Sequence, residues 1–132
     1  MGRGGVFSVE SLSGIYVVVV DAEKDRRAVL TSILRYCGAL VTPVETPDNA
    51  FAVMEIIKPD AVVLQLAALD DASADMIRRL RSEEASGGSI AAVAVGATGL
   101  GDVARHCGFD AYIEKPFDPW ELCRVVSELV TT

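Results

Sequence analysis

The chain has 132 residues, of which 51% are hydrophobic, and it carries a formal net charge of −7. This length suits one domain with a buried core, and the hydrophobic fraction excludes a disordered chain. The negative charge argues against a nucleic-acid-binding surface, which needs clustered lysine and arginine. The longest uncharged apolar run, residues 15–20, is too short to span a bilayer, and residues 1–14 contain no apolar signal segment. We therefore expect a cytoplasmic protein with no membrane association.

Apolar runs typical of buried strands alternate along the chain with segments of helical periodicity. Residues 1–14 are rich in glycine and serine, and we predict a flexible tail before a domain that spans residues 15–130. Strands are predicted at residues 15–20, 40–44, 61–66, 90–95 and 111–113. Helices are predicted at residues 24–37, 47–57, 73–83 and 99–107, and from residue 118 onward.

Local signals mark the ends of several helices. Gly38 is expected to end the first helix. Thr46 followed by Pro47 is typical of an N-cap and a first helical position, and Asp118 followed by Pro119 repeats the pattern before the last helix.

Five β/α units of this kind predict an α/β fold, in which a doubly wound parallel sheet of five strands carries helices on both faces. For this number of strands the expected order is 2-1-3-4-5. The working crevice of such folds lies at the carboxyl ends of the strands. That edge should bring together Asp21, Gln65, Gly96 and Lys115.

Three segments of the chain resemble the receiver domains of response regulators. Residues 17–30 (VVVVDAEKDRRAVL) resemble the first strand and acidic loop of that family, and residues 59–66 (PDAVVLQL) resemble its third strand. Residues 107–122 (CGFDAYIEKPFDPWEL) resemble its segment with a tyrosine and a Lys-Pro-Phe sequence, which is the most specific match. The resemblance covers nearly all of residues 15–130 and implies a CheY-like, flavodoxin-like fold in a two-component (phosphorelay) system.

The chain departs from the family's pattern where the family's chemistry lies. The resemblance implies an aspartate that accepts a phosphoryl group, but this chain has Gln65 there, and an amide cannot form an acyl phosphate. It implies two acids that hold Mg²⁺ after the first strand, but Ala22 replaces the one that follows Asp21. Gly96 replaces a hydroxyl residue that senses the phosphoryl group, whereas Lys115 is retained. We therefore expect a degenerate pocket, a pseudo-receiver, with no catalytic residue.

The altered pocket leads to further expectations. Only Asp21 and Glu23 remain as weak metal candidates, so Mg²⁺ binding is not expected, and no other cofactor is predicted. Lys115 should pair with Asp21 and donate to the side-chain oxygen of Gln65, which would fix this edge without a metal. The alternative is that Gln65 is only a tolerated polar residue at a strand end. The resemblance also implies a cis bond between Lys115 and Pro116.

Two other functions were weighed against this interpretation. A regulator that accepts a phosphoryl group on a non-standard carboxylate would need Asp70 or Asp71, which lie several residues past the acceptor position. A nucleotide-binding domain would use the glycines between Gly96 and Gly101 to hold phosphate. Asp102, however, stands where that motif needs its third glycine, and the segment follows the fourth predicted strand instead of the first.

Other potential sites are few. The cysteines Cys37, Cys107 and Cys123 are odd in number and widely spaced, which predicts neither a disulfide framework nor a zinc site. We assign no chemistry to His106, the single histidine.

We expect a protein–protein interaction module in signalling and not an enzyme. The resemblance implies signalling through the face of the fourth helix, fifth strand and fifth helix, which here would include parts of residues 99–107, Tyr112 and the outer side of residues 120–130. Tyr112, Phe117 and Trp120 are the switch or contact candidates, since tyrosine and tryptophan dominate binding hot spots; for Trp120 the alternative is packing at the helix start. Partners should be other signalling proteins, with a homodimer through the same face as an alternative, and neither nucleic acid nor membrane.

Overall fold

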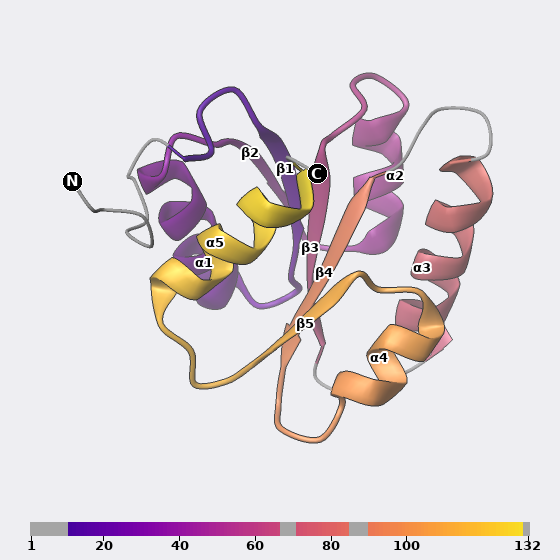
Figure 1. Cartoon of the computed structure of the whole chain (residues 1–132). Helices are drawn as coiled ribbons and strands as arrows, with labels where there is room; N and C mark the ends of the chain where they lie inside the picture. Colours follow the sequence, from indigo (N-terminus) through magenta and orange to yellow (C-terminus); the bar gives the residue numbers. More distant parts are fainter. Residues whose placement is uncertain (1–10, 67–70, 85–89, 131–132) are drawn as a thin grey trace.

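The computed structural model describes residues 11–66, 71–84 and 90–130, and in them five parallel strands alternate with five helices (Figure 1). The sheet has the order β2-β1-β3-β4-β5, which confirms the predicted topology. None of the helices in these ranges has the length and hydropathy that a bilayer crossing requires. In chain order the elements are β1 Tyr16–Val20, α1 Lys24–Tyr36, β2 Leu40–Val44, α2 Pro47–Met54, β3 Ala61–Leu66, α3 Asp71–Glu84, β4 Ala91–Gly96, α4 Gly101–Cys107, β5 Ala111–Glu114 and α5 Pro119–Val130.

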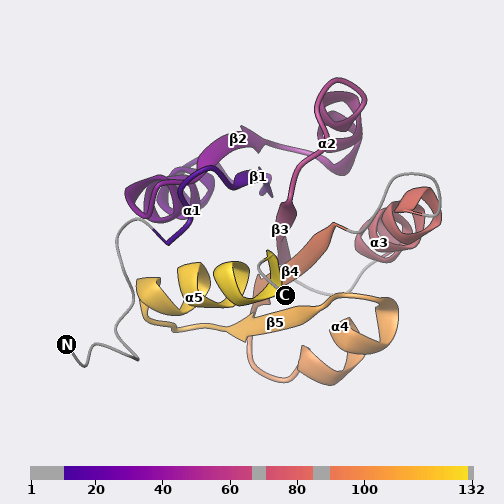
Figure 2. The ribbon, with the colours of Figure 1, turned by 45° about the horizontal axis from the view of Figure 1, so that its top comes forward.

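Helices cover both faces of the sheet, with α1 and α5 on one face and α2, α3 and α4 on the other (Figure 2). The strands β1 and β4 carry hardly any polar side chains, because successive side chains of a central strand enter opposite cores. Val17 and Val19 of β1 pack on the side of α1 and α5, whereas Val18 and Val20 pack on the side of the other three helices.

The helix termini follow the predicted signals. The Thr46 side chain accepts a hydrogen bond from the Asn49 N–H (3.1 Å) and Pro47 opens α2. The Asp118 carboxylate accepts one from the Trp120 N–H (2.9 Å) at the start of α5. Gly38 follows α1 with a φ of +99°, a conformation that favours glycine.

The packed domain begins earlier than predicted. Residues 1–10 of the predicted tail lie outside the described residues, but residues 11–14 form a turn. Leu12 is fully buried in the core beside α1, and its N–H donates to the Cys37 carbonyl at the end of that helix (3.0 Å). A boundary at Ile15 is therefore wrong, because Leu12 both fills the core and satisfies a carbonyl that the end of α1 leaves open.

The three cysteines are free thiols, as predicted. Cys37 and Cys123 are buried near each other between α1 and α5. Burial and a hydrogen bond with Cys37 raise the pKa of the Cys123 thiol, which is the state of a packing residue and not of a nucleophile.

Candidate functional site

The carboxyl ends of the central strands assemble the predicted set of residues. Asp21 follows β1 directly, and its N–H donates to the Val44 carbonyl (3.1 Å). Leu66, the last residue of β3, pairs in register with Gly96, the last residue of β4. Lys115 follows β5, and its N–H donates to the Gly96 carbonyl (2.8 Å). The Lys115-Pro116 bond is cis, as the resemblance implied.

Asp21 is paired with Arg26 and not with Lys115. The Asp21 carboxylate is fully buried, and it accepts hydrogen bonds from Nε (2.7 Å) and Nη2 (2.8 Å) of Arg26 and from the Glu23 N–H (2.9 Å). Arg27 adds a bond from its Nη1 to the Asp21 carbonyl (2.8 Å). The predicted pair of Lys115 with Asp21 is therefore wrong, because the arginine satisfies both carboxylate oxygens with one planar fork.

Sequence reasoning missed Arg26, although a signal was present. Arg26 and Arg27 lie in the first turn of α1, where the helix dipole disfavours a positive charge. Two arginines in this position need a nearby anion. Asp21, five residues before Arg26, supplies a buried carboxylate.

The acids near Asp21 do not form a metal site. The exposed Glu23 side chain caps α1 by accepting the N–H groups of Asp25 (3.0 Å) and Arg26 (2.7 Å), and these bonds lower its pKa. Ala22 offers no oxygen ligand, and the Asp21 carboxylate is already held by three donors. Since Mg²⁺ needs several hard oxygen ligands, these residues do not fit it. No group of three acidic, histidine or cysteine side chains that could hold a metal occurs in the described part of the chain.

Gln65 and Lys115 each retain unsatisfied bonding capacity. The Gln65 Nε2 donates only to the Leu66 carbonyl (3.3 Å), and its Oε1 is buried with no partner. The predicted bond from Lys115 to this oxygen is absent, and the Lys115 amine makes no hydrogen bond or ion pair within residues 11–66, 71–84 and 90–130. Burial and the nearby positive charge of Arg26 lower the pKa of Lys115, against a weaker opposite effect of Asp21.

The Tyr112 hydroxyl lies in the space that a side chain at position 96 would need. A Cβ atom on Gly96 would lie 2.5 Å from the Leu66 carbonyl oxygen and 2.7 Å from the Tyr112 hydroxyl oxygen. Tyr112 is only 8% exposed and donates its hydroxyl to the Ala97 carbonyl, and burial raises its pKa. The tyrosine ring thus points inward, into space that any larger residue at position 96 would occupy.

Two other contact candidates, Trp120 and Phe117, make contacts on the side of α1 and α5. Trp120 is 41% exposed and stacks at a tilt on Tyr36 of α1, with ring centroids 5.8 Å apart. Phe117 is partly buried against the core on the side of α1 and α5. The contact with Tyr36 agrees with the alternative that Trp120 packs at the helix start, and its role on the face of α4, β5 and α5 stays a prediction.

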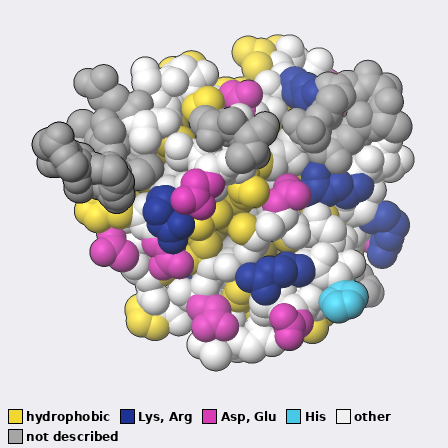
Figure 3. All heavy atoms as spheres, viewed as in Figure 1, with side chains coloured by type: hydrophobic (Ala, Val, Ile, Leu, Met, Phe, Trp, Pro, Cys, Tyr) yellow, Lys and Arg dark blue, Asp and Glu magenta, His cyan; other side chains and the backbone are white. Residues whose placement is uncertain are grey.

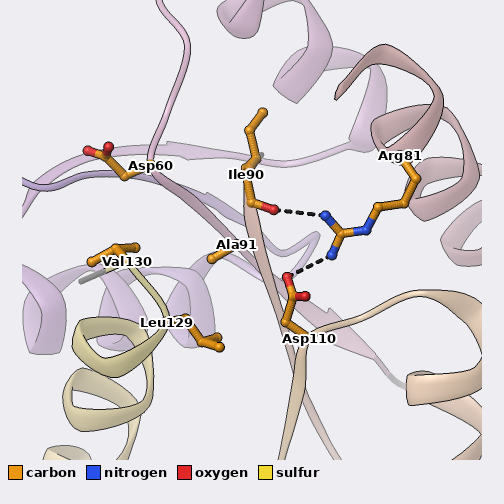
Figure 4. A pocket seen from close by; sticks show the side chains of 7 residues that line it. All are labelled: Asp60, Arg81, Ile90, Ala91, Asp110, Leu129 and Val130. Carbon is orange, nitrogen blue, oxygen red and sulfur yellow. Dashed lines mark hydrogen bonds and ion pairs between the residues drawn. The ribbon is translucent and has the colours of Figure 1, made fainter. Parts of the chain in front are cut away.

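The opposite, amino edge of the sheet carries a cavity of about 320 Å³ (Figure 4). Arg81 of α3 crosses it, donating to the Ile90 carbonyl (2.9 Å) and, through two nitrogens, to the Gly108 carbonyl. It also pairs with Asp110 (2.7 Å), which in turn accepts the Ala92 N–H (2.7 Å). Arg81 and Asp110 are therefore bound to each other and to the backbone around this cavity.

Asp70 is outside the described residues, and Asp71 opens α3. The structure therefore does not test either of them as a non-standard acceptor.

Comparison with known proteins places this geometry among receivers. No family model matches the chain. The chain is 30% identical over 123 residues to the "Uncharacterized 14.6 kDa protein in sodA1 3'region" of Leptolyngbya boryana, a match that covers 91% of this chain and 93% of that protein. It is 30% identical over 103 residues to the "Probable transcriptional regulatory protein TcrX" of Mycobacterium tuberculosis. That match covers 78% of this chain but only 44% of TcrX, so the chain spans less than half of that protein.

Solved structures share the fold at lower identity. A putative response regulator from Chloroflexus aurantiacus superposes with a TM-score of 0.80 at 20% identity, over 89% of this chain and 98% of that one. The receiver domain of Ssk1 from Saccharomyces cerevisiae, crystallised with the histidine phosphotransfer protein Ypd1, gives 0.78 at 17% identity, over 91% of each chain. The chain therefore belongs to the family of the Leptolyngbya boryana protein, and its fold is that of a response-regulator receiver domain.

Proposed function

We propose that the chain is an atypical receiver domain of two-component signal transduction that acts in the cytoplasm as a phosphorylation-independent protein-interaction module. The observation that carries the proposal is the pair of Asp21 with Arg26 beside Gln65. In this pocket a side chain of the protein neutralises the remaining acid, and no carboxylate stands at the acceptor position.

The chemistry of phosphoryl transfer supports this proposal. The reaction needs a nucleophile and a metal charge that is positioned against the transferred group. Gln65 supplies no anionic oxygen, and a cation could reach Asp21 only by displacing Arg26 from both carboxylate oxygens. The retained Lys115 could still attract an anion, but it has no reaction partner in the pocket.

The position of Tyr112 supports a single conformational state. Its hydroxyl bonds to the Ala97 carbonyl in the space that the missing Gly96 side chain leaves. With the ring held inside, the face formed by α4, β5 and α5 keeps one shape and needs no phosphoryl signal to reach it.

The face of α4, β5 and α5 is the proposed binding surface for partner proteins. Its charges are mixed, with acidic, basic and hydrophobic side chains interspersed (Figure 3). Val103 of α4 is 48% exposed. The ion pairs Arg105–Asp102 (3.8 Å) and Arg124–Glu128 (3.3 Å) each lie within one helix, α4 and α5 respectively. A mixed surface of this kind suits another protein better than nucleic acid, which would select a basic one.

Treatment with acetyl phosphate and Mg²⁺, followed by intact-mass measurement, tests the proposal. We expect no mass gain for the natural chain and none for Gln65→Asp, because Arg26 still occupies Asp21. A triple variant with Ala22→Asp, Arg26→Ser and Gln65→Asp should gain a phosphoryl group, which shows that the fold and the donor are competent. A stable gain on the natural chain would overturn the proposal and would point to Asp70 or Asp71.

A further inference from the structure

The outward face of α1 differs from that of an ordinary surface helix. Exposed residues at helical spacing form one stripe along it, and between Asp25 at one end and Arg35 at the other this stripe carries no charge. Val29 is 58% exposed and Tyr36 is 66% exposed. The members of the stripe in chain order are Asp25, Ala28, Val29, Ser32, Arg35 and Tyr36.

Among the positive charges of α1, Lys24 is exposed in the first turn, Arg26 and Arg27 are engaged beside the stripe, and Arg35 lies at its carboxyl end. Arg26 is bound to Asp21, and Arg27 donates to the Asp21 carbonyl. Arg35 donates one N–H to the Val41 carbonyl of the neighbouring strand (3.0 Å) and remains exposed. The helix therefore presents small and apolar side chains outward, with an acid at its amino end and a guanidinium beside its carboxyl end.

An aromatic pair widens the apolar part of this surface. Tyr36 and Trp120 bring α1 and the first turn of α5 together, with ring centroids 5.8 Å apart. Both rings keep a large exposed fraction, and exposed aromatic residues of this kind are typical anchors of protein interfaces.

We propose that this α1 face binds a second copy of the chain, with the two α1 helices antiparallel about a two-fold axis near Val29 and Ser32. In that arrangement Asp25 of each copy lies opposite Tyr36 and Arg35 of the other. The two-fold axis gives two such contacts, and in each an acid faces a guanidinium and the amino end of one helix lies beside the carboxyl end of the other. The small side chains Ala28 and Ser32 leave room for the helices to approach at the centre. Neither Gln65 nor the α4–β5–α5 face takes part.

The contact is small. The 13 residues of α1 span roughly 20 Å, and one helix pair with flanking rings falls below the area of stable interfaces, about 1,200 Å². The dimer should therefore be weak and should depend on protein concentration.

Sedimentation velocity of the full chain over a wide concentration range tests the proposal. We expect a reversible shift from monomer to dimer, and a dissociation constant raised about tenfold or more by Val29→Glu, which puts an unpaired charge at the centre. The control variants Ile56→Glu, beyond α2, and Val103→Glu, on α4, place the same charge at other exposed apolar residues and should leave the shift unchanged. A monomer at all concentrations, or a dimer that Val103→Glu or Ile56→Glu weakens as much as Val29→Glu does, overturns the proposal.

Charge exchange tests the antiparallel arrangement. Asp25→Arg and Arg35→Glu should each weaken the dimer, and the double variant should restore it, with circular dichroism checking that each variant is folded. Ser32→Cys should form an intermolecular disulfide under mild oxidation, whereas the exposed Ala52→Cys on α2 should not. Failure of the double variant to recover, or equal cross-linking at both positions, contradicts the geometry, and neither result depends on the phosphorylation assay.

Discussion

At each edge of the sheet an arginine is bound to an aspartate, but the two edges differ in the polar groups that remain without a hydrogen-bond partner. At the amino edge, Arg81 and Asp110 exchange bonds with each other and with backbone groups of β4 and the turn before β5. At the carboxyl edge, Arg26 satisfies Asp21, yet the Gln65 oxygen is buried without a partner and the Lys115 amine has none among the described residues.

This difference separates a structural link from an altered site. A polar group buried without a partner costs free energy, so it is retained only where it has another role or where the site has changed its chemistry. The amino edge shows the pattern of a region whose role is stability. At the carboxyl edge, where we propose that the phosphorylation site has lost its partner groups, one buried oxygen and one amine keep no partner among the described residues. The variants below test whether the two edges respond as this comparison predicts.

Arg81→Met should have the largest effect. It removes four hydrogen bonds to Ile90, Gly108 and Asp110, and we expect a loss of about 3–4 kcal/mol in the free energy of unfolding. Urea denaturation measures the loss. Arg78→Met, whose pair with Asp75 is exposed, is the matched control and should change stability by about 0.5 kcal/mol or less. Equal losses for the two variants would contradict a structural role for Arg81.

Arg26→Met should come next, with a loss of about 2–3 kcal/mol. It leaves the fully buried Asp21 carboxylate with only the Glu23 N–H as donor, and the partial exposure of Arg26 moderates the cost. Arg105→Met, which breaks an exposed pair with Asp102, is the control in the same denaturation experiment. If Arg26→Met is as mild as its control, Arg26 does not neutralise Asp21, and the metal-free interpretation of the pocket fails.

Gly96→Ser should cost about 1–2 kcal/mol, because its Cβ overlaps the Tyr112 hydroxyl and the Leu66 carbonyl. Tyr112→Phe removes one of these contacts along with the bond to Ala97, so the double variant should lose less than the sum of the single losses. A double-mutant cycle in urea measures this coupling. Strictly additive losses would mean that Gly96 and Tyr112 do not share the space.

The fold followed from the sequence to a large extent because the central strands are almost entirely apolar. Runs such as residues 61–66 fix a buried parallel strand, and the carboxyl ends of such strands must meet at one edge. The sequence alone therefore assigns Asp21, Gln65, Gly96 and Lys115 to one edge of the sheet.

The pairing within that pocket could not be predicted in the same way. Both Arg26 and Lys115 can reach Asp21, and the choice depends on side-chain rotamers and on how α1 leaves β1. The direction of Trp120 depends on the rotation of α5, and the burial of Leu12 depends on space that only the packed helices define.

Lys115→Met should have the smallest effect, and it should be a gain. The pKa of Lys115 is lower in the folded protein than its ordinary value of 10.5, mainly through burial and then through Arg26. The charged amine therefore opposes folding at neutral pH, and this opposition fades as the pH rises through the folded pKa toward the unfolded one. Methionine keeps the aliphatic stem and removes the charge, so stability at neutral pH should rise by less than about 1 kcal/mol, since a partly exposed charge is screened.

Thermal unfolding at neutral and at alkaline pH measures this gain, which should shrink as the pH approaches 10.5. Lys58→Met, at an exposed lysine beyond α2, is the control and should show no such pH dependence. A loss of stability in Lys115→Met would show that the amine has a favourable anionic partner in the folded protein. The carboxyl edge would then resemble the amino edge, with its charges matched, and the contrast between an altered pocket and a structural link would no longer hold.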